Sequence, residues 1–400
     1  MPLFFIYFLF VPTVVIGFGF LLTNLLFRNK VENIDLGILG ILGYLFLYFI
    51  SNLIHLFLEI SDLIILLVQI VGFLLFIYFL LSKRIRSFEL IKLFVLSLTL
   101  LPIAIISEPN EDFYYYYLPY LEYLESSYII FGLVNLNDTL TYSTNSLYDI
   151  LIFFKLPFVF QNVYSVPIYY IYIFYLIFLF NRFQKTKNIF YFFVLSLSLI
   201  AFTNLRDFGT SIPPQLILII CGCLIYENIF FKYSEKKISL IITLLTLALI
   251  LRINSIIIFP FLIFLIFTYY NKIFEFLFKN KLQIFFLSIL LILFFGKNLI
   301  HSGCLIYPIH NTCFENLEWS TDINIVKQKN YKLQADSKGW AFYAKDFYNI
   351  KDKYVWKNLR GENFVGYSEY SKKSPVFWIK YWLKDPNYKK ILNIFIINII

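Results

Sequence analysis

The sequence predicts an all-α polytopic membrane protein with about 10–11 transmembrane helices and a small region outside the membrane. Of its 400 residues, 60% are hydrophobic and only 15% are charged, and the mean hydropathy is +0.73. The core of a soluble domain does not need that much apolar surface. The apolar runs are continuous rather than alternating, which favours spanning helices over a closed strand barrel.

The spans are predicted from apolar stretches that can cross a hydrocarbon layer of roughly 30 Å, which takes about 20 residues. The predicted segments are 3–27, 36–58, 63–82, 88–106, 163–181, 188–203, 212–231, 238–251, 254–270 and 282–300, with a last one from Tyr388. The first segment lacks a basic leader and is typical of a retained span rather than a cleaved signal peptide. Residues 238–270 would reach roughly 50 Å as one helix, so we expect two short helices that turn at Arg252-Ile253-Asn254.

Orientation follows from the positive residues, which recur in every second connection. They are Arg28 and Lys30; Lys83, Arg84 and Arg86; Arg182, Lys185 and Lys187; Lys232, Lys236 and Lys237; Lys272, Lys279 and Lys281. The other connections carry Glu59 and Asp62, then the stretch 108–149 without Lys or Arg, then Arg206 with Asp207. Because short basic loops stay in the cytoplasm, we expect the N-terminus outside and the acidic connections on the outer face.

Three regions are predicted: a transmembrane domain 1–300, an extracytoplasmic region 301–387, and a segment 388–400 that starts a further span or lies in the interface. The transmembrane domain includes an outer loop, 107–162, with a short apolar piece near 151–160 that lies in the interface or re-enters. All five tryptophans fall in 301–387, and the spacing of Trp378 and Trp382 is typical of an interfacial anchor. Short cytoplasmic loops without a phosphate-binding motif argue against a nucleotide-binding domain, and no module for nucleic acid is recognisable.

Cysteines and histidines give one structural prediction and one candidate ligand. Cys304 and Cys313 flank a short loop on the predicted outer side, where a disulfide is permitted, and two free thiols are the alternative. His55, His301 and His310 lack zinc-site spacing. His301 lies near an outer membrane boundary and is a candidate phosphate contact.

The candidate reaction site is a group of carboxylates directly after the fourth predicted span. Asn110-Glu111-Asp112 can be an ordinary helix N-terminus, and the tyrosines that follow can pack at the bilayer surface. The functional alternative depends on a carboxylate cluster without a basic partner in the same loop, namely Glu108, Glu111, Asp112, Glu122, Glu125 and Asp138. Crowded carboxylates raise each other's pKa, bind a divalent cation, or meet cations from elsewhere.

Cations in other outer connections are the natural partners of these carboxylates. Arg206, Arg252 and Lys297 all lie at predicted outer ends of spans. Each has a structural alternative, which is an ion pair with Asp207 for Arg206 and snorkelling to the interface for the other two. Together they predict an electropositive rim that holds a phosphate or pyrophosphate opposite an acidic base.

Three short blocks carry a resemblance to a known class. They are Asp112-Phe113-Tyr114-Tyr115 with Leu118-Pro119, then Thr141-Tyr142-Ser143-Thr144-Asn145-Ser146, and then Ser302-Gly303-Cys304-Leu305-Ile306-Tyr307-Pro308. An early outer loop with an acidic residue, aromatics and Leu-Pro resembles the GT-C superfamily, and the blocks resemble bacterial membrane proteins related to it. The likeness covers most of the chain in layout but only these blocks in sequence. Tyr117 stands where those relatives carry His, so a role of that His is not expected here.

The resemblance implies a GT-C-like fold and a glycosyltransferase that takes its sugar from a polyprenyl-phosphate donor at the outer face of a bacterial cytoplasmic membrane. It places an acidic residue of the first outer loop at the active site, which maps to Asp112 or Glu111. The chemistry needs a base for the acceptor hydroxyl, and Arg, Lys or a divalent metal ion to stabilise the departing phosphate. No other cofactor is expected.

Roles for the candidate residues follow from that chemistry. Asp112 is the expected base, with Glu111 or Glu108 as its helper or metal ligand. The phosphate candidates are Arg206, Arg252, Lys297 and His301. Tyr114 and Tyr115 stack on the sugar or lie at the lipid boundary.

Two other functions stay open. A transporter or flippase of lipid-linked glycans usually carries charge near the bilayer midplane in broken helices, often with internal symmetry, whereas most charges here fall at span ends. A non-catalytic assembly subunit is the third alternative. An Asp112 that faces a cavity near the cationic residues would favour the enzyme, and an Asp112 in open solvent would favour the other two.

Overall fold

The computed structural model describes residues 2–27, 35–82, 87–109, 112–155, 164–203, 210–231, 234–270, 279–347 and 365–384. The described residues form helices and short helical turns, and no strand. The chain divides into two compact units, Met1–His301 and Ser302–Ile400. The predicted segment 388–400, Glu111, Arg206 and the end of the apolar piece near 151–160 lie outside the described residues.

Seven helices are long and apolar enough to cross a membrane. They are α1 (Pro2–Phe27), α2 (Leu36–His55), α3 (Asp62–Leu81), α4 (Ser87–Ile106), α8 (Ser165–Thr186), α10 (Ile212–Phe230) and α14 (Lys281–Ser302). Three further apolar helices are shorter: α9 (Ile189–Thr203), α11 (Glu235–Leu251) and α12 (Phe259–Thr268). The described part of the chain therefore has fewer full-length spans than the 10–11 predicted. The long apolar run breaks at Arg252, where the backbone is extended after α11.

The connections of the first unit are built from short helical pieces. These are η2 (Phe113–Tyr117), α5 (Leu118–Ser126), α6 (Leu133–Leu136), η3 (Asp138–Thr141), η4 (Ser143–Leu147), α7 (Tyr148–Leu151), η5 (Ile152–Phe154) and η8 (Ile253–Ile258). The side chains of α7 and η5 are buried in the first unit. The described start of the predicted interfacial piece is therefore packed among helices.

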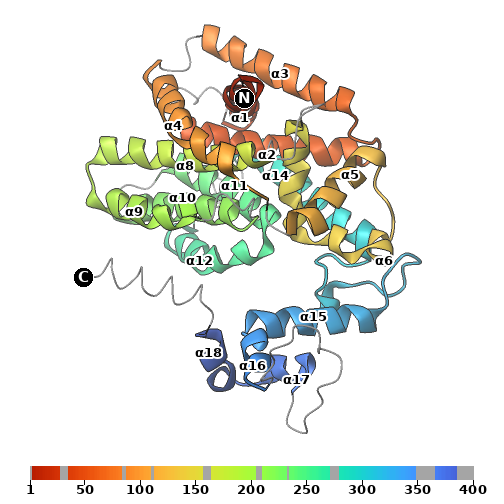
Figure 1. Ribbon diagram of the computed structural model, residues 1–400. Helices are drawn as coiled ribbons and strands as arrows, with labels where there is room; N and C mark the ends of the chain where they lie inside the picture. The colour runs from red at the N-terminus through yellow and green to blue at the C-terminus, as the bar shows by residue number, and fades with distance from the viewer. Residues whose placement is uncertain are drawn as a thin grey trace. The chain divides into compact units, whose positions relative to one another are not determined.

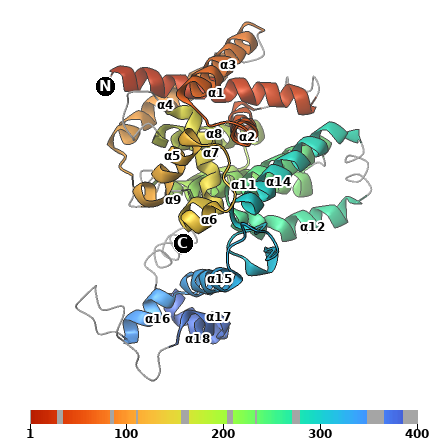
Figure 2. The same cartoon turned by 90° about the vertical axis from the view of Figure 1, so that its right-hand side faces the viewer.

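Glycines let α1 pack closely against α2 and α3, which it crosses (Figure 1, Figure 2). A Cβ added to Gly43 of α2 would lie 2.0 Å from the Val15 carbonyl oxygen of α1, and one added to Gly17 would lie 2.0 Å from the Gly72 oxygen of α3. Such backbone approaches are typical of helix pairs in membranes, where close packing contributes much of the association energy. Beside these backbone approaches, aromatic side chains of α1 stack on the other two helices, as in Phe18 on Phe46 of α2 and Phe20 on Phe79 of α3.

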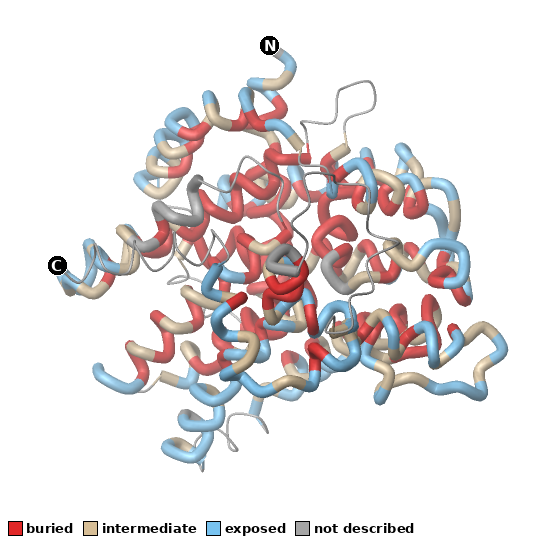
Figure 3. Tube along the Cα trace, turned by 60° about the horizontal axis from the view of Figure 1, so that its bottom comes forward, coloured by how far each residue is buried: buried red, intermediate tan, exposed pale blue. Residues whose placement is uncertain are grey.

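Burial separates interior helices from those on the surface of the first unit (Figure 3). Helices α2 and α8 are buried over most of their length, whereas only a third or less of the apolar windows of α3, α4 and α14 is buried. The exposed side chains of α3 and α4 are apolar, as in Leu66, Leu67 and Phe94. An apolar exposed face of this size is what lipid contact requires.

Polar contacts tie helix ends together in two groups. At one end, Glu227 of α10 is buried and accepts hydrogen bonds from Arg182 of α8 (3.2 Å), Lys237 of α11 (2.9 Å) and the Tyr191 hydroxyl of α9 (2.5 Å). The start of α2 joins this end through Asp35, which accepts from the Asn181 amide of α8 at 2.9 Å. The final turns of α2 and α14 lie at the opposite end, where they meet Asp149. Neighbouring helices therefore alternate in direction.

Asp35 provides a pH-dependent contribution to stability. Burial raises its pKa to about 6, against the lowering effects of the Asn181 hydrogen bond and the Arg182 charge. The folded state therefore holds the proton more tightly than the unfolded state, and stability falls as the pH rises from about 4 through 6. Asparagine does not ionise, so the free energy of unfolding of Asp35→Asn should fall less with rising pH than that of the wild type. We expect the difference between the two proteins to change by roughly 1–2 kcal/mol, in favour of the variant, between acidic and neutral pH. Thermal unfolding in mild detergent at pH 4.5 and 7.5 measures it, and parallel pH profiles would contradict it.

The second unit contains η9 (His310–Thr312), α15 (Ile323–Ser337), α16 (Trp340–Phe347), α17 (Tyr367–Lys372) and α18 (Pro375–Trp382). Its own core includes Trp340, Tyr343, Tyr370 and Tyr381. A disulfide joins Cys304 and Cys313. The unit begins one residue after His301, close to the start predicted for region 301–387.

Candidate functional site

Asp149 is a carboxylate within an apolar run. It belongs to α7, and the side chains from Leu147 to Phe154 around it are all buried. Asp149 itself is 1% exposed. A buried carboxylate costs much free energy unless it is paired and hydrogen-bonded.

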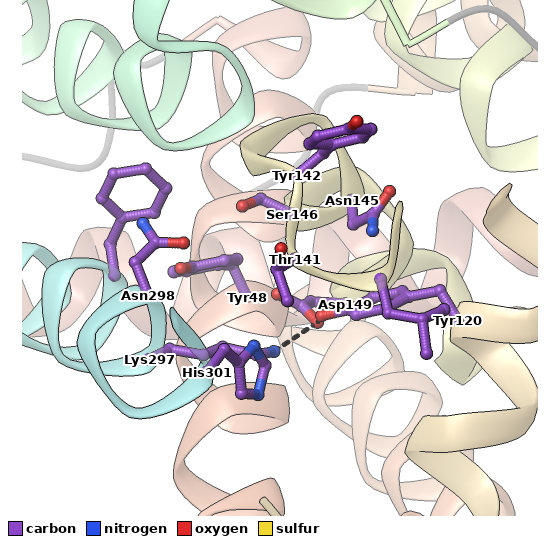
Figure 4. A pocket seen from close by; sticks show the side chains of 12 residues that line it. Tyr48, Tyr120, Thr141, Tyr142, Asn145, Ser146, Asp149, Lys297, Asn298 and His301 are labelled. Carbon is purple, nitrogen blue, oxygen red and sulfur yellow. Dashed lines mark hydrogen bonds and ion pairs between the residues drawn. The ribbon is translucent and has the colours of Figure 1, made fainter. Parts of the chain in front are cut away.

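Partners from three distant parts of the chain meet this carboxylate (Figure 4). The Lys297 ammonium of α14 lies 2.7 Å from Oδ1, and the Tyr120 hydroxyl of α5 donates to the same oxygen at 2.6 Å. The Asn52 amide of α2 donates to Oδ2 at 3.4 Å. Lys297 is 9% exposed, and its nitrogen lies 5.5 Å from the centre of the Tyr120 ring. The arrangement joins α2, α5, α7 and α14.

A small cavity, with enclosed room for about one water molecule, borders the ion pair. Its lining is Tyr48, Tyr120, Leu140, Thr141, Tyr142, Asn145, Ser146, Asp149, Phe294, Lys297, Asn298 and His301. The Asn145 side-chain oxygen is buried there and has no hydrogen-bond partner among the described residues. Because buried polar atoms are nearly always paired in proteins, this acceptor is free for the polar group of a ligand.

His301 connects the cavity to a second pair of aromatic residues. The Tyr123 hydroxyl lies 3.1 Å from His301 Nε2, and its oxygen accepts a hydrogen bond from the Ile130 backbone N–H at 3.1 Å. With its oxygen occupied in this way, the hydroxyl can donate its proton to Nε2. The His55 ring contacts Tyr123 edge-on, with ring centres 5.0 Å apart. His301 is thereby held as a neutral acceptor towards Tyr123.

Two tyrosines at the cavity are kept neutral. Burial raises the pKa of Tyr120 well above its usual value, and the charge of Asp149 raises it further. Burial, with the charge of Asp138, raises the pKa of Tyr142 to about 12. Both hydroxyls therefore keep their protons at neutral pH and can donate hydrogen bonds.

Two of the residues predicted from sequence reach the cavity, namely Lys297 and His301. Asp112 and Glu108 are exposed and do not line it, and Tyr114 and Tyr115 are exposed as well. Arg252 caps the end of α11, is partly exposed, and does not line the cavity either. By the criterion stated for it, the exposure of Asp112 favours the two non-enzymatic alternatives. A reaction site at the cavity would have to use Asp149, the carboxylate that lines it.

The acidic outer loop is also better paired than the sequence indicated. Lys155, near the end of that loop, lies 2.6 Å from Glu125 and 3.3 Å from Asp62. Burial lowers the pKa of Lys155, but the two carboxylates outweigh this effect and raise it. Part of the carboxylate cluster is therefore neutralised by a lysine of the same loop rather than by a cation from another connection.

Sequence reasoning missed Asp149, although two signals could have found it. It is a carboxylate in an apolar stretch, LYDILIFF, and a charge in such a position is costly unless it has a role. It also follows the block from Thr141 to Ser146, four members of which line the cavity. The ion pair also joins α7 to α14, so it has a structural role as well.

No cluster of three or more His, Cys, Asp or Glu side chains suited to a metal ion occurs in the described ranges. Lys297 is therefore the cation that the described residues offer to an anionic group at the cavity.

The family model described as "Domain of unknown function (DUF8201)" matches residues 1–400, so the chain belongs to that family. No curated protein and no solved structure matches the chain. The function is therefore argued from the cavity and its residues.

Proposed function

We propose that this member of the DUF8201 family is a GT-C-like membrane glycosyltransferase. It transfers a sugar from a polyprenyl-phosphate donor to an acceptor hydroxyl at the outer face of a bacterial cytoplasmic membrane. The observation that carries the proposal is the Asp149–Lys297 pair, which borders a cavity with free hydrogen-bonding capacity.

The two charged residues have complementary roles in this reaction. The Asp149 carboxylate accepts the proton of the acceptor hydroxyl while that oxygen bonds to the anomeric carbon of the sugar. The bond between that carbon and the donor phosphate oxygen breaks, and its electron pair leaves with the phosphate. Lys297 has three N–H donors, of which one serves Asp149, so it can also stabilise the phosphate.

The remaining polar groups suit a sugar. Asn145 offers an acceptor to a sugar hydroxyl. The Tyr120 and Tyr142 hydroxyls donate their protons to Asp149 and Asp138, and their oxygens can accept further hydrogen bonds. Aromatic rings at the cavity add apolar surface for the sugar ring. These groups come from the block Thr141–Ser146 and from α5, which follows the Leu-Pro of the first block.

A comparison of two carboxylate variants tests the proposal. Membranes containing the protein are given a panel of polyprenyl-phosphate donors with radiolabelled hexoses and pentoses, and transfer to endogenous acceptor is counted. We expect Asp149→Asn to reduce transfer by about 10²–10⁴-fold and Asp112→Asn to retain it. The exposed Glu315→Gln is the control for expression and labelling.

Each outcome of that comparison is decisive. Loss of transfer only in Asp112→Asn would move the base to the position predicted from sequence. Full transfer in both variants would show that neither Asp149 nor Asp112 acts as the base. If the wild-type protein transfers no sugar from any donor of the panel, the proposed transferase function is wrong.

A further inference from the structure

The second unit presents an unusual surface on α18. Val376, Ile379 and Leu383 are 84%, 44% and 46% exposed. Their spacings of three and four residues place them on one side of the helix, and we call these three residues the α18 face. The opposite side of α18 is packed, because Phe377 and Tyr381 contact the core of the second unit. The apolar face is thus separate from the contacts that hold the unit together.

Lysines surround this face. Lys380 lies in α18, and Lys384 lies two residues after its last residue. Both lysines are exposed. Lys372, also exposed, lies just before α18, while the neighbouring Lys373 is paired with Glu369 at 2.8 Å. Between Val365 and Lys384 the sequence has four lysines and a single carboxylate. An apolar stripe with a positive border matches the surface of a bilayer that contains anionic lipids.

Two further features point to lipid rather than to a protein partner. Trp378 and Trp382 lie beside the face and are partly exposed, while Trp378 also packs against the core of the second unit. Tryptophan is enriched at membrane interfaces. The sequence continues with Lys389-Lys390 and then with ten residues from Ile391 to Ile400 that are apolar except for two asparagines. A positive and then strongly apolar sequence directly after α18 is typical of chain at a lipid surface.

We propose that the α18 face docks on the membrane surface and binds anionic lipid headgroups through Lys380 and Lys384. The three aliphatic side chains enter the headgroup boundary, and the lysines lie at the level of the phosphates. This refines the anchor expected from Trp378 and Trp382, since the aliphatic side chains are the more exposed part of the helix. The proposal does not depend on the reaction proposed for the cavity.

A nitroxide label on the α18 face tests the docking. The full chain is placed in nanodiscs of phosphatidylcholine, with or without phosphatidylglycerol, and labelled at Ile379→Cys. The added thiol is the accessible one, because Cys221 and Cys223 are buried and Cys304 is bonded to Cys313. The matched control is a label at Ser337→Cys, an exposed position on α15 of the same unit.

Collision of the label with oxygen, which concentrates in lipid, is compared with collision with an aqueous nickel chelate. With phosphatidylglycerol present, we expect the ratio of oxygen to nickel collisions to be several-fold higher at position 379 than at position 337. Replacement of both lysines, Lys380→Gln and Lys384→Gln, should lower the ratio at position 379 towards that of the control.

The opposite results would overturn the proposal. A label at position 379 that is as open to nickel as the control, in both lipid mixtures, shows that the face lies in water. Dipolar broadening between labels on two chains assigns the face to a second copy instead. If the ratio at position 379 changes neither with phosphatidylglycerol nor with the lysine replacements, the face does not bind anionic headgroups.

Discussion

Lys297→Met should destabilise the folded protein by about 3–5 kcal/mol, which is the usual cost of removing one partner of a buried ion pair. The variant leaves the Asp149 carboxylate, 1% exposed, with hydrogen bonds only from Tyr120 and Asn52 among the contacts described. Methionine fills the space of the lysine stem, so the loss reports the missing charge rather than a cavity. Unfolding in mixed detergent, followed by far-ultraviolet circular dichroism of the helices, measures the change.

The double variant Asp149→Asn/Lys297→Met is the control for this experiment. It removes both charges and retains an amide that can accept the Tyr120 hydrogen bond, so most of the lost stability should return. If the double variant is as unstable as Lys297→Met, the loss of stability does not come from an unpaired Asp149 charge. A double variant that is stable but transfers no sugar would separate the chemical role of the pair from its structural role.

Gly43→Leu should prevent α1 and α2 from packing and reduce the yield of folded protein to a small fraction of wild type. Even a Cβ at this position would lie 2.0 Å from the Val15 carbonyl oxygen and 2.9 Å from the Val15 side chain. The obstructing atom belongs to the backbone of α1, so the clash can be avoided only if the two helices move apart. Overpacking of this kind costs about 1–3 kcal/mol or more. Size-exclusion profiles of a fluorescent fusion in detergent measure the folded fraction.

Gly222→Ala is the matched control for the glycine prediction. Gly222 lies in α10, and nothing lies within 4 Å of a Cβ added there. Alanine is the better helix former by roughly 0.5–1 kcal/mol, so this variant should be neutral or slightly more stable. Equal losses in the two variants would contradict the packing explanation for Gly43.

The prediction of Asp112 as the catalytic base illustrates the limit of local reasoning. A carboxylate beside tyrosines at a span end has the same sequence signature whether it faces a cavity or water. The chain places Asp112 on the surface and buries Asp149, which lies farther along the same loop. Lys297 was identified as a candidate cation, but its partner was assigned to the wrong part of the loop.

Helix location was predictable because it depends on local composition. Seven apolar stretches became helices of 19 or more residues at close to the predicted positions, and the break at Arg252 falls where one helix would have been too long for a bilayer. Among the described residues, α9, α11 and α12 are apolar but have only 15, 17 and 10 residues, fewer than the roughly 20 of a full span. This part of the chain therefore shows fewer full-length spans than the 10–11 predicted.

By itself, then, the amino-acid order determined that this is a helical membrane-type chain, where its main helices lie, and how positive residues alternate between their connections. Only the tertiary structure decided that Asp149 meets Lys297, which is 148 residues away, and that Tyr120 and Asn52 complete the site. The physical reason is that the transfer of a segment into lipid depends on its own side chains. The partner of a buried charge depends instead on which helices pack together, and close backbone contacts such as those at Gly17 and Gly43 set that packing.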